Sequence, residues 1–222
     1  MPTSGSSTTS VPSQGVEEPK LSPAGPRAGG PSDRERWDRR WSEGSHGAGD
    51  PPDWIDASGL ALPNRGRALD VACGPGRGAR WLARRGLEVL AVDLSPVALA
   101  RLEQDARREG LPIRTLALDL QSAPLPAGPF VLITCLAYLQ RDLFAALIER
   151  LAPGGWLAVE IATRRNLERH AHPGPRFLLE EGELPGLLAP LELAFYREGW
   201  SGEGPDARHL ARALARRATA RG

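Results

Sequence analysis

The sequence predicts an open α/β fold in which a mostly parallel, doubly wound sheet carries helices on both faces. In residues 67–86, a short apolar run is followed by a glycine-rich turn and then by a helical pattern. Strand-like and helix-like segments continue to alternate after it, which favours a parallel sheet. The run 130–135 is apolar without interruption, as expected for a strand that is covered on both sides.

The glycine-rich turn predicts a nucleoside-binding site. Gly74, Gly76 and Gly78 stand at alternate positions, so the backbone can approach a ligand closely, and the next helix directs its free N–H groups to the same place. A dinucleotide site has the spacing G-x-G-x-x-G, but the third glycine here comes one position earlier. Asp70 at the end of the strand would repel a phosphate and suits an amine or sulfonium. We therefore expect a positively charged nucleoside without phosphate.

The following elements are predicted from apolar patterns, caps and turn residues. Ser95 and Pro96 predict the start of a helix that ends before Gly110. Residues 140–142 open a further helix, whose buried stripe extends to Leu151. The strands expected after the first one are 87–93, 113–118, 130–135, 156–161 and 191–196.

The C-terminal third is less regular. A turn at 153–155 is expected to lead into the strand 156–161, and 177–188 is interpreted as a turn followed by a short helix. Residues 207–217 are ambiguous, because Ala, Leu and Arg favour a helix.

The N-terminal part divides into a tail and the start of the domain. Residues 1–31 are rich in Pro, Ser, Gly and Thr and nearly lack large apolar side chains, so we expect a disordered tail before a single domain at 32–222. The domain is expected to begin with a short helix that places Trp37 and Trp41 on one face. His46 follows in a glycine-rich loop and is expected to be solvated.

Composition and charge limit the classes of function. With 222 residues, of which 41% are apolar, the chain is long enough for one domain with a sizeable core. The net charge of +1 gives no reason to expect nucleic acid or a membrane surface as a partner, and no apolar run approaches the roughly 20 residues of a spanning helix. The first ten residues lack the features of a secretory signal. Cys73 and Cys135 form neither a disulfide framework nor a metal motif, so we expect reduced thiols in a cytoplasmic protein without a metal site.

Five segments, in order, resemble the motifs of the class I S-adenosylmethionine-dependent methyltransferases. The turn reads Asp70-x-x-x-Gly74-x-Gly76-x-Gly78, like the first motif of this class. The other four are AVDLSPVAL at 91–99, LALDLQSAPLP at 116–126, FVLITCLAYLQRDLF at 130–144 and LAPGGWLAVE at 151–160. Within the class, the blocks WDRRW, YLQRDLF, FLLEEGEL and YREG resemble the tellurite-resistance and thiopurine methyltransferase-like group.

The resemblance implies a Rossmann-like sheet of seven strands and S-adenosylmethionine as cofactor. The short connection from Asp119 to Phe130 then crosses to the other half of the sheet, where the strand order reverses and leaves a crevice for ligands. Residues 207–217 become a seventh strand, antiparallel to the others. In this class, the segment corresponding to 32–60 folds over the cofactor.

The expected cofactor site combines position along the chain with the resemblance. Asp93 ends the second strand, where a carboxylate accepts the ribose hydroxyls. The resemblance places Asp119 near the adenine amino group and allows Arg40 to pair with the cofactor's carboxylate. The residues expected to contact the cofactor are Trp37, Arg40, Trp41, Asp70, Ala72, Cys73, Gly74, Pro75, Gly76, Gly78, Asp93, Leu94, Ser95, Asp119, Leu120, Cys135 and Leu136.

The methyl acceptor is expected at the same edge of the sheet, below a polar, basic lid at 163–176. In-line methyl transfer neutralises charge, so the protein chiefly supplies alignment and a water-poor pocket. The relatives it resembles methylate soft nucleophiles, which favours a small thiol or chalcogen oxyanion as acceptor. The side chains expected to hold it are Tyr138, Arg141, His170, His172 and Arg208. For an oxygen or nitrogen acceptor, the expected base is His170, His172 or His209.

Two other classes of function remain possible from the sequence. A non-catalytic protein with this fold would bind the cofactor without an acceptor pocket. An NAD(P)-dependent oxidoreductase would use a similar strand, turn and helix, but it predicts the later third glycine and does not explain Asp70 or Asp119. The oligomeric state and the identity of the acceptor stay open, with a monomer favoured.

Overall fold

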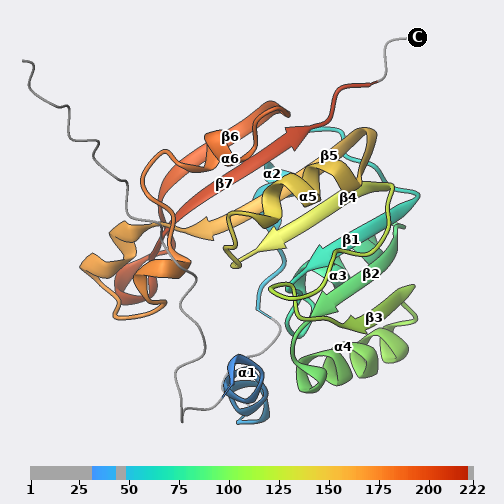
Figure 1. Cartoon of the computed structure of the whole chain (residues 1–222), viewed down its shortest axis with the longest axis horizontal. Coiled ribbons are helices and arrows are strands. Elements are labelled where there is room, and N and C mark those ends of the chain that lie inside the picture. The colour runs from blue at the N-terminus through green and yellow to red at the C-terminus, as the bar shows by residue number, and fades with distance from the viewer. Residues whose placement is uncertain (1–31, 44–48, 220–222) are drawn as a thin grey trace, which may run out of the picture.

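The computed structural model describes residues 32–43 and 49–219. The predicted disordered tail at 1–31 and the loop residue His46 lie outside the described residues. A seven-stranded sheet with the order β3-β2-β1-β4-β5-β7-β6 forms the centre (Figure 1). Its strands are β1 (Arg67–Val71), β2 (Glu88–Asp93), β3 (Ile113–Ala117), β4 (Phe130–Leu136), β5 (Leu151–Ala162), β6 (Glu192–Ser201) and β7 (Arg208–Arg216).

The sheet topology confirms the predicted fold class. β1 to β5 pair in parallel, whereas β7 runs antiparallel between β5 and β6. The chain leaves β3 at one edge and returns beside β1 as β4, so the strand order reverses between β1 and β4. The carboxyl ends of these two adjacent strands therefore bound the crevice where open α/β sheets bind ligands.

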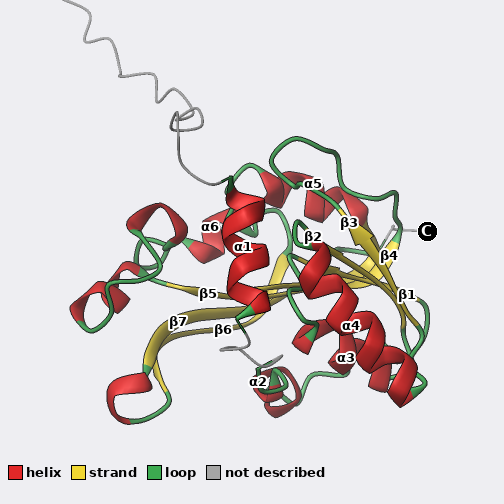
Figure 2. Cartoon of the chain, turned by 90° about the horizontal axis from the view of Figure 1, so that it is seen from below, coloured by secondary structure: helices red, strands yellow, loops and turns green. Residues whose placement is uncertain are grey.

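Helices cover both faces of the sheet (Figure 2). One face carries α2 (Asp53–Ala57), α3 (Arg77–Arg84) and α4 (Pro96–Glu109), and the other carries α5 (Leu143–Arg150) and α6 (Leu184–Leu187). Each face has its own apolar cluster, because successive side chains of a strand point to opposite sides. Leu69 and Val71 of β1, for example, belong to the α5 side, and Ala68 belongs to the α3 side.

The predicted short helix around Trp37 and Trp41, α1 (Asp33–Ser42), and the predicted boundaries of α4 are confirmed. The Ser32 side chain accepts a hydrogen bond from the Glu35 N–H while the Glu35 side chain accepts one from the Ser32 N–H, a reciprocal capping box. Ser95 caps α4 and Pro96 is its first residue. Gly110 ends α4 in the left-handed conformation, with φ of 67°, which glycine adopts without steric cost.

Two details of the C-terminal third correct the prediction. The turn predicted at 153–155 lies within β5, which begins at Leu151 opposite Phe130, whereas Trp156 is opposite Leu132. β5 pairs with β4 on both sides of the glycines, so the residues of the predicted turn form an irregularity within the strand. Leu151 therefore belongs to β5 and is not part of α5. β6 also continues beyond the predicted end at residue 196 to Ser201, because it pairs with β7 along its whole length.

The ambiguous segment 207–217 is a strand, as the resemblance implied. β7 pairs with β5 over seven registered positions and with β6 on its other side, and its alternate residues Ala211, Ala213 and Ala215 are fully buried. No helix in the described part of the chain is long and apolar enough to cross a membrane.

Candidate functional site at the carboxyl edge of the sheet

The turn after β1 surrounds a buried carboxylate. Asp70 is 2% exposed, and its Oδ1 accepts a hydrogen bond of 2.6 Å from the Thr134 hydroxyl of β4. Its Oδ2 is buried and has no hydrogen-bond partner among the described residues. Burial raises the pKa of this carboxyl to about 6, although the hydrogen bond from Thr134 opposes the shift. A cationic ligand group would satisfy the unpartnered oxygen and favour the ionised form.

The backbone around this carboxylate is unusual. Ala72 after β1 has φ of 51° and Ala137 after β4 has φ of 64°, both in the left-handed region that side chains other than glycine rarely adopt. They follow the two strands between which the strand order reverses. Such strain is retained where the surrounding structure enforces it, and it concentrates at ligand sites. Gly74 and Gly76 have positive φ as well, so the whole turn depends on backbone that few residues tolerate.

Asp93 joins the turn after β1 to the turn after β2. Its Oδ2 accepts from the Gly74 N–H at 2.7 Å and its Oδ1 accepts from the Ser95 N–H at 2.9 Å. Burial raises the pKa of this carboxyl, and hydrogen bonds from the backbone N–H groups of Ser95, Gly74 and Leu94 partly offset that rise. A carboxylate has about four acceptor sites, so acceptor capacity remains for the predicted ribose hydroxyls.

Helix α1 lies over the carboxyl ends of the strands (Figure 1). The Ser95 hydroxyl donates a 2.5 Å hydrogen bond to Asp38 of α1, and a Cβ on Gly74 would lie 3.2 Å from the Trp41 ring. Trp37 and Trp41 stack with ring centroids 6.0 Å apart, confirming that they share a face. Asp38 was missed by the sequence reasoning, although its place between the two tryptophans puts it near that face.

The hydrogen bond between Ser95 and Asp38 is expected to hold α1 in place. Ser95→Ala removes this bond and the cap of α4, where Ser95 accepts from the Ala98 N–H, so it should cost about 1 kcal/mol of unfolding free energy. Asp38→Ala removes only the bond to α1. Hydrogen exchange should accelerate over 33–42 in both variants but not in the control Glu43→Gln, at the exposed end of α1. Unchanged protection of α1 in Asp38→Ala would contradict this prediction.

Asp70 is expected to make the stability of the cofactor-free protein depend on pH. Burial raises its folded pKa to about 6 from an ordinary value of 3.8, so its contribution is complete below about pH 4 and is lost as the pH rises through 6. Each pKa unit corresponds to ~1.4 kcal/mol. The unfolding free energy of Asp70→Asn, measured relative to that of the wild type, should therefore rise by about 3 kcal/mol between pH 4 and pH 7.5. Urea unfolding of both proteins across this range measures the difference. A difference that does not change with pH would contradict the assignment.

The predicted adenine end lies in the turn after β3. The Asp119 carboxylate accepts from the Gln121 N–H and the Ser122 hydroxyl, both at 2.9 Å, so it also shapes its own turn. Gln140, which the sequence reasoning missed, donates to the Leu120 carbonyl at 3.2 Å and accepts from the Tyr138 hydroxyl at 2.7 Å. Gln140 therefore ties the segment after β4 to the turn after β3.

Both cysteines are buried and free. Burial raises the pKa of the Cys135 thiol to about 12 and also raises that of Cys73. Cys135 lies beside Val71 in the paired strands β4 and β1, within the apolar cluster on the α5 side. Among the described residues, no group of three or more His, Cys, Asp or Glu side chains is placed to hold a metal ion.

The side chains predicted for the acceptor form two groups. Tyr138 and Arg141 follow β4, and Arg141 makes a bidentate ion pair with Glu183, at 2.5 and 2.8 Å, and also donates to the Leu178 carbonyl. His170 and Arg208 contact each other at 2.6 Å, and His170 also contacts the Ala207 carbonyl. His172 is exposed, and no contact joins it to either group.

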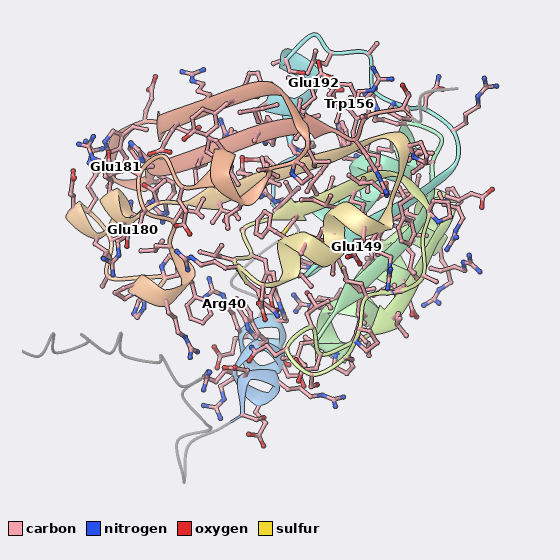
Figure 3. All side chains as sticks on the ribbon, turned by 45° about the horizontal axis from the view of Figure 1, so that its top comes forward. Arg40, Glu149, Trp156, Glu180, Glu181 and Glu192 are labelled. Atoms are coloured by element: carbon pink, nitrogen blue, oxygen red, sulfur yellow. The ribbon has the colours of Figure 1, made fainter. Side chains whose placement is uncertain are left out.

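The segment 163–176, which was predicted to be a substrate lid, is fixed at its base and approaches α1 at its far end. It contains the 3₁₀ helices η1 (Arg164–Glu168) and η2 (Pro175–Phe177). At its base, Thr163, Asn166 and His209 form a buried hydrogen-bonded cluster, with 2.7 Å between Thr163 Oγ1 and His209 Nδ1. At its far end, Arg176 lies 4.0 Å from Asp33 of α1. In Figure 3, Arg40 lies on the side of α1 that faces the segment carrying Glu180 and Glu181.

A second buried carboxylate lies on the α3 side of β5. Glu160 is 5% exposed and accepts from Arg77 of α3 and Arg212 of β7, each at 2.7 Å. Its backbone carbonyl accepts a 2.6 Å hydrogen bond from the N–H of the strained Ala137. This network was not predicted, because Arg77 lies 83 residues before Glu160 and Arg212 lies 52 residues after it.

The strand order and the buried acidic turn define a class I methyltransferase fold. Residues 68–155 match the family model described as "Methyltransferase domain". This segment is similar to the methyltransferase domains, and the seven-stranded sheet around it has the fold of the class I S-adenosylmethionine-dependent methyltransferases. Asp70, Gly74 and Asp93, which were predicted to contact the cofactor, all lie in the matched segment.

Curated relatives match only part of their own length. The chain is 32% identical over 138 residues to "Hemagglutinin 1" of Eikenella corrodens, covering 60% of this chain and 46% of that protein. It is 29% identical over 123 residues to "Ubiquinone biosynthesis O-methyltransferase" of Burkholderia orbicola, and the match covers 53% of this chain and 52% of that protein. The chain thus spans about half the length of the curated relatives it matches.

Solved structures show the same fold at low sequence identity. TehB from Haemophilus influenzae has a TM-score of 0.64 and 20% identity, covering 82% of this chain and 67% of that chain. The N-methyltransferase NodS from Bradyrhizobium japonicum, solved with S-adenosyl-L-homocysteine, has a TM-score of 0.62 and 19% identity. The match covers 83% of this chain and 97% of that chain.

Proposed function

We propose that this chain transfers a methyl group from S-adenosylmethionine to a small acceptor with a soft nucleophilic atom, a thiol or a chalcogen oxyanion. The residues present fit the cofactor. Asp70 offers a buried, unpartnered carboxylate oxygen to a cationic group, and Asp93 keeps acceptor sites for ribose hydroxyls. When bound, the cofactor supplies an electrophilic methyl group on its sulfonium.

The protein's part in this proposal is to enclose and align. Trp41 packs against the glycine turn and Asp38 fixes α1 over the carboxyl ends of the strands, which excludes water from that edge. Gln140 holds the Tyr138 hydroxyl and the turn after β3 in one arrangement. Alignment of the reacting atoms and exclusion of water are the contributions that in-line methyl transfer needs most.

The proposal of a soft acceptor rests on the contacts and the protonation of the side chains near it. His170 is held between the Ala207 carbonyl and the Arg208 guanidinium, and His209 is buried against Thr163. Burial raises the pKa of the Tyr138 phenol well above its usual value, so this hydroxyl stays protonated. Of the three candidate histidines, His170 and His209 are engaged in these contacts and His172 is exposed outside both groups, which supports an acceptor that needs no deprotonation by the protein.

Calorimetric titration with S-adenosylmethionine, S-adenosylhomocysteine and NADH tests the cofactor. We expect micromolar binding of both adenosyl ligands, loss of that binding in Asp93→Asn, and no response to NADH. Glu88→Gln, on the exposed start of the same strand, is the matched control and should bind as the wild type. Folded protein that binds neither adenosyl ligand would refute the proposal, and binding of NADH alone would support an oxidoreductase.

The acceptor is tested by the release of S-adenosylhomocysteine over a panel of small thiols, selenite, tellurite, phenols and amines. The proposal expects turnover with thiols or chalcogen oxyanions, and the rate should fall at least about tenfold in Tyr138→Phe if the hydroxyl positions the acceptor. Turnover with phenols or amines alone would refute the soft acceptor. Cofactor binding without turnover on any member would favour a non-catalytic binding protein.

A further inference from the structure

A pocket of about 170 Å³ lies on the outer surface of α3, where the segment 49–57 packs against the helix. Its charged lining consists of Arg77, Arg80, Arg84 and Arg85, together with Asp56. We call it the arginine pocket. The four arginines form one stripe, because positions three, four, seven and eight residues apart share a helix face.

The acids that neutralise these arginines contact them from outside the pocket. Glu160 reaches Arg77 from β5, Asp105 and Glu109 of α4 reach Arg80, and Glu109 also reaches Arg84. Only Asp56, which pairs with Arg85 at 2.5 Å, belongs to the lining. The carboxylates therefore offset the charge of the arginines mainly from behind, and the pocket walls themselves present chiefly guanidinium groups, whose N–H donors suit an anion.

The arginines also keep donors available. Each ion pair uses one terminal nitrogen: Nη2 in Arg77 and Arg84, and Nη1 in Arg80 and Arg85. The second terminal nitrogen of each has no hydrogen-bond partner within 32–43 and 49–219. None of these four nitrogens is among the buried unpartnered atoms, so they reach solvent. Four guanidinium groups thus present unused N–H donors around one small space.

The size of the pocket selects the class of ligand. Sites for drug-sized molecules or nucleosides occupy roughly 300–1,000 Å³. A volume of 170 Å³ corresponds to about five water molecules at ~30 Å³ each and suits a single hydrated tetrahedral anion. Arginine matches such an anion because its planar fork donates two parallel hydrogen bonds to neighbouring oxygens.

We propose that the arginine pocket binds a phosphate-type oxyanion, either free phosphate or the phosphate group of a small phosphomonoester. No step of the proposed methyl transfer uses the donors of the pocket, although the charge of Arg77 also acts on the Asp70 carboxyl and opposes the rise of its pKa. The test therefore substitutes Arg84, at the other end of α3. This test does not depend on the outcome of the cofactor or acceptor experiments.

Calorimetric titration of the full chain, in chloride buffer at pH 7, compares inorganic phosphate with glycerol 3-phosphate. At least one should bind with a Kd below about 1 mM. Arg84→Gln should weaken that binding by about tenfold or more, and Arg84→Lys, which keeps the charge but loses the fork, by less. Arg107→Gln is the matched control on α4, since Arg107 also forms an ion pair but lies outside the pocket.

The two ligands distinguish the source of the anion. Tighter binding of glycerol 3-phosphate identifies a phosphomonoester, and tighter binding of inorganic phosphate identifies the free ion; both results support the proposal. Circular dichroism verifies that each variant is folded. Absence of binding for both ligands, or an equal loss in Arg84→Gln and Arg107→Gln, would overturn it.

Discussion

Gly78→Ala is expected to lower the affinity for S-adenosylmethionine by at least about 100-fold, or ~2.7 kcal/mol. A Cβ at this position would lie 2.6 Å from Oδ1 and 2.9 Å from Oδ2 of Asp70, closer than real Cβ atoms come to their neighbours. The carboxylate is buried and held by Thr134, so it has no free space into which to move. The substitution therefore displaces the charge that we expect the cofactor's cationic group to contact.

Titration calorimetry with both adenosyl ligands measures this effect. Gly186→Ala is the matched control, because Gly186 also lies in a helix and a Cβ there would have no neighbour within 4 Å. Near-ultraviolet circular dichroism establishes that the Gly78→Ala protein retains its tertiary packing. An affinity within about threefold of the wild type, in folded protein, would show that the position of the Asp70 carboxylate is unimportant for binding.

Glu160→Gln is expected to cost about 2–4 kcal/mol of unfolding free energy. It leaves the guanidinium groups of Arg77 and Arg212 without their buried counter-charge, and removing one member of a buried ion pair is far more costly than removing an exposed one. Urea unfolding measures the loss. Glu192→Gln, at the exposed start of β6 (Figure 3), should change the stability by less than about 0.5 kcal/mol.

A triple variant separates the charge effect from lost packing. Replacing Glu160, Arg77 and Arg212 together by methionine removes all three charges, and stability should return to within about 1–2 kcal/mol of the wild type. A triple variant as unstable as Glu160→Gln would show that the network acts through shape. A Glu160→Gln protein as stable as the wild type would show that Arg77 and Arg212 find sufficient solvation without the carboxylate.

Local sequence was sufficient for much of the fold because its signals are short-range. The cap at Ser95, the proline after it and Gly110 determine where α4 begins and ends, and each acts within one turn of the helix. The uninterrupted apolar run in β4 reports burial on both faces of the sheet. Patterns of this kind require no knowledge of distant residues.

The cofactor site was partly predictable for the same reason. Asp70, Gly74, Gly76 and Gly78 act within one strand, turn and helix, and the structure brings them together as their spacing indicated. The acceptor residues were chosen by resemblance and chemistry. In the structure, Arg141 is paired with Glu183, whereas His170 and Arg208 contact each other. Sequence spacing gave no information about these partners.

What the sequence alone determined about this protein is its alternating α/β class, the helix ends and the acidic glycine turn, because propensity, capping and glycine conformation act between near neighbours. The tertiary structure decided the rest. It made 207–217 a strand, because pairing with β5 and β6 outweighs the helix preference of its residues. It also created the Glu160 network, the Ser95 to Asp38 bond and the arginine pocket, because each joins segments that only the folded sheet brings within hydrogen-bonding distance.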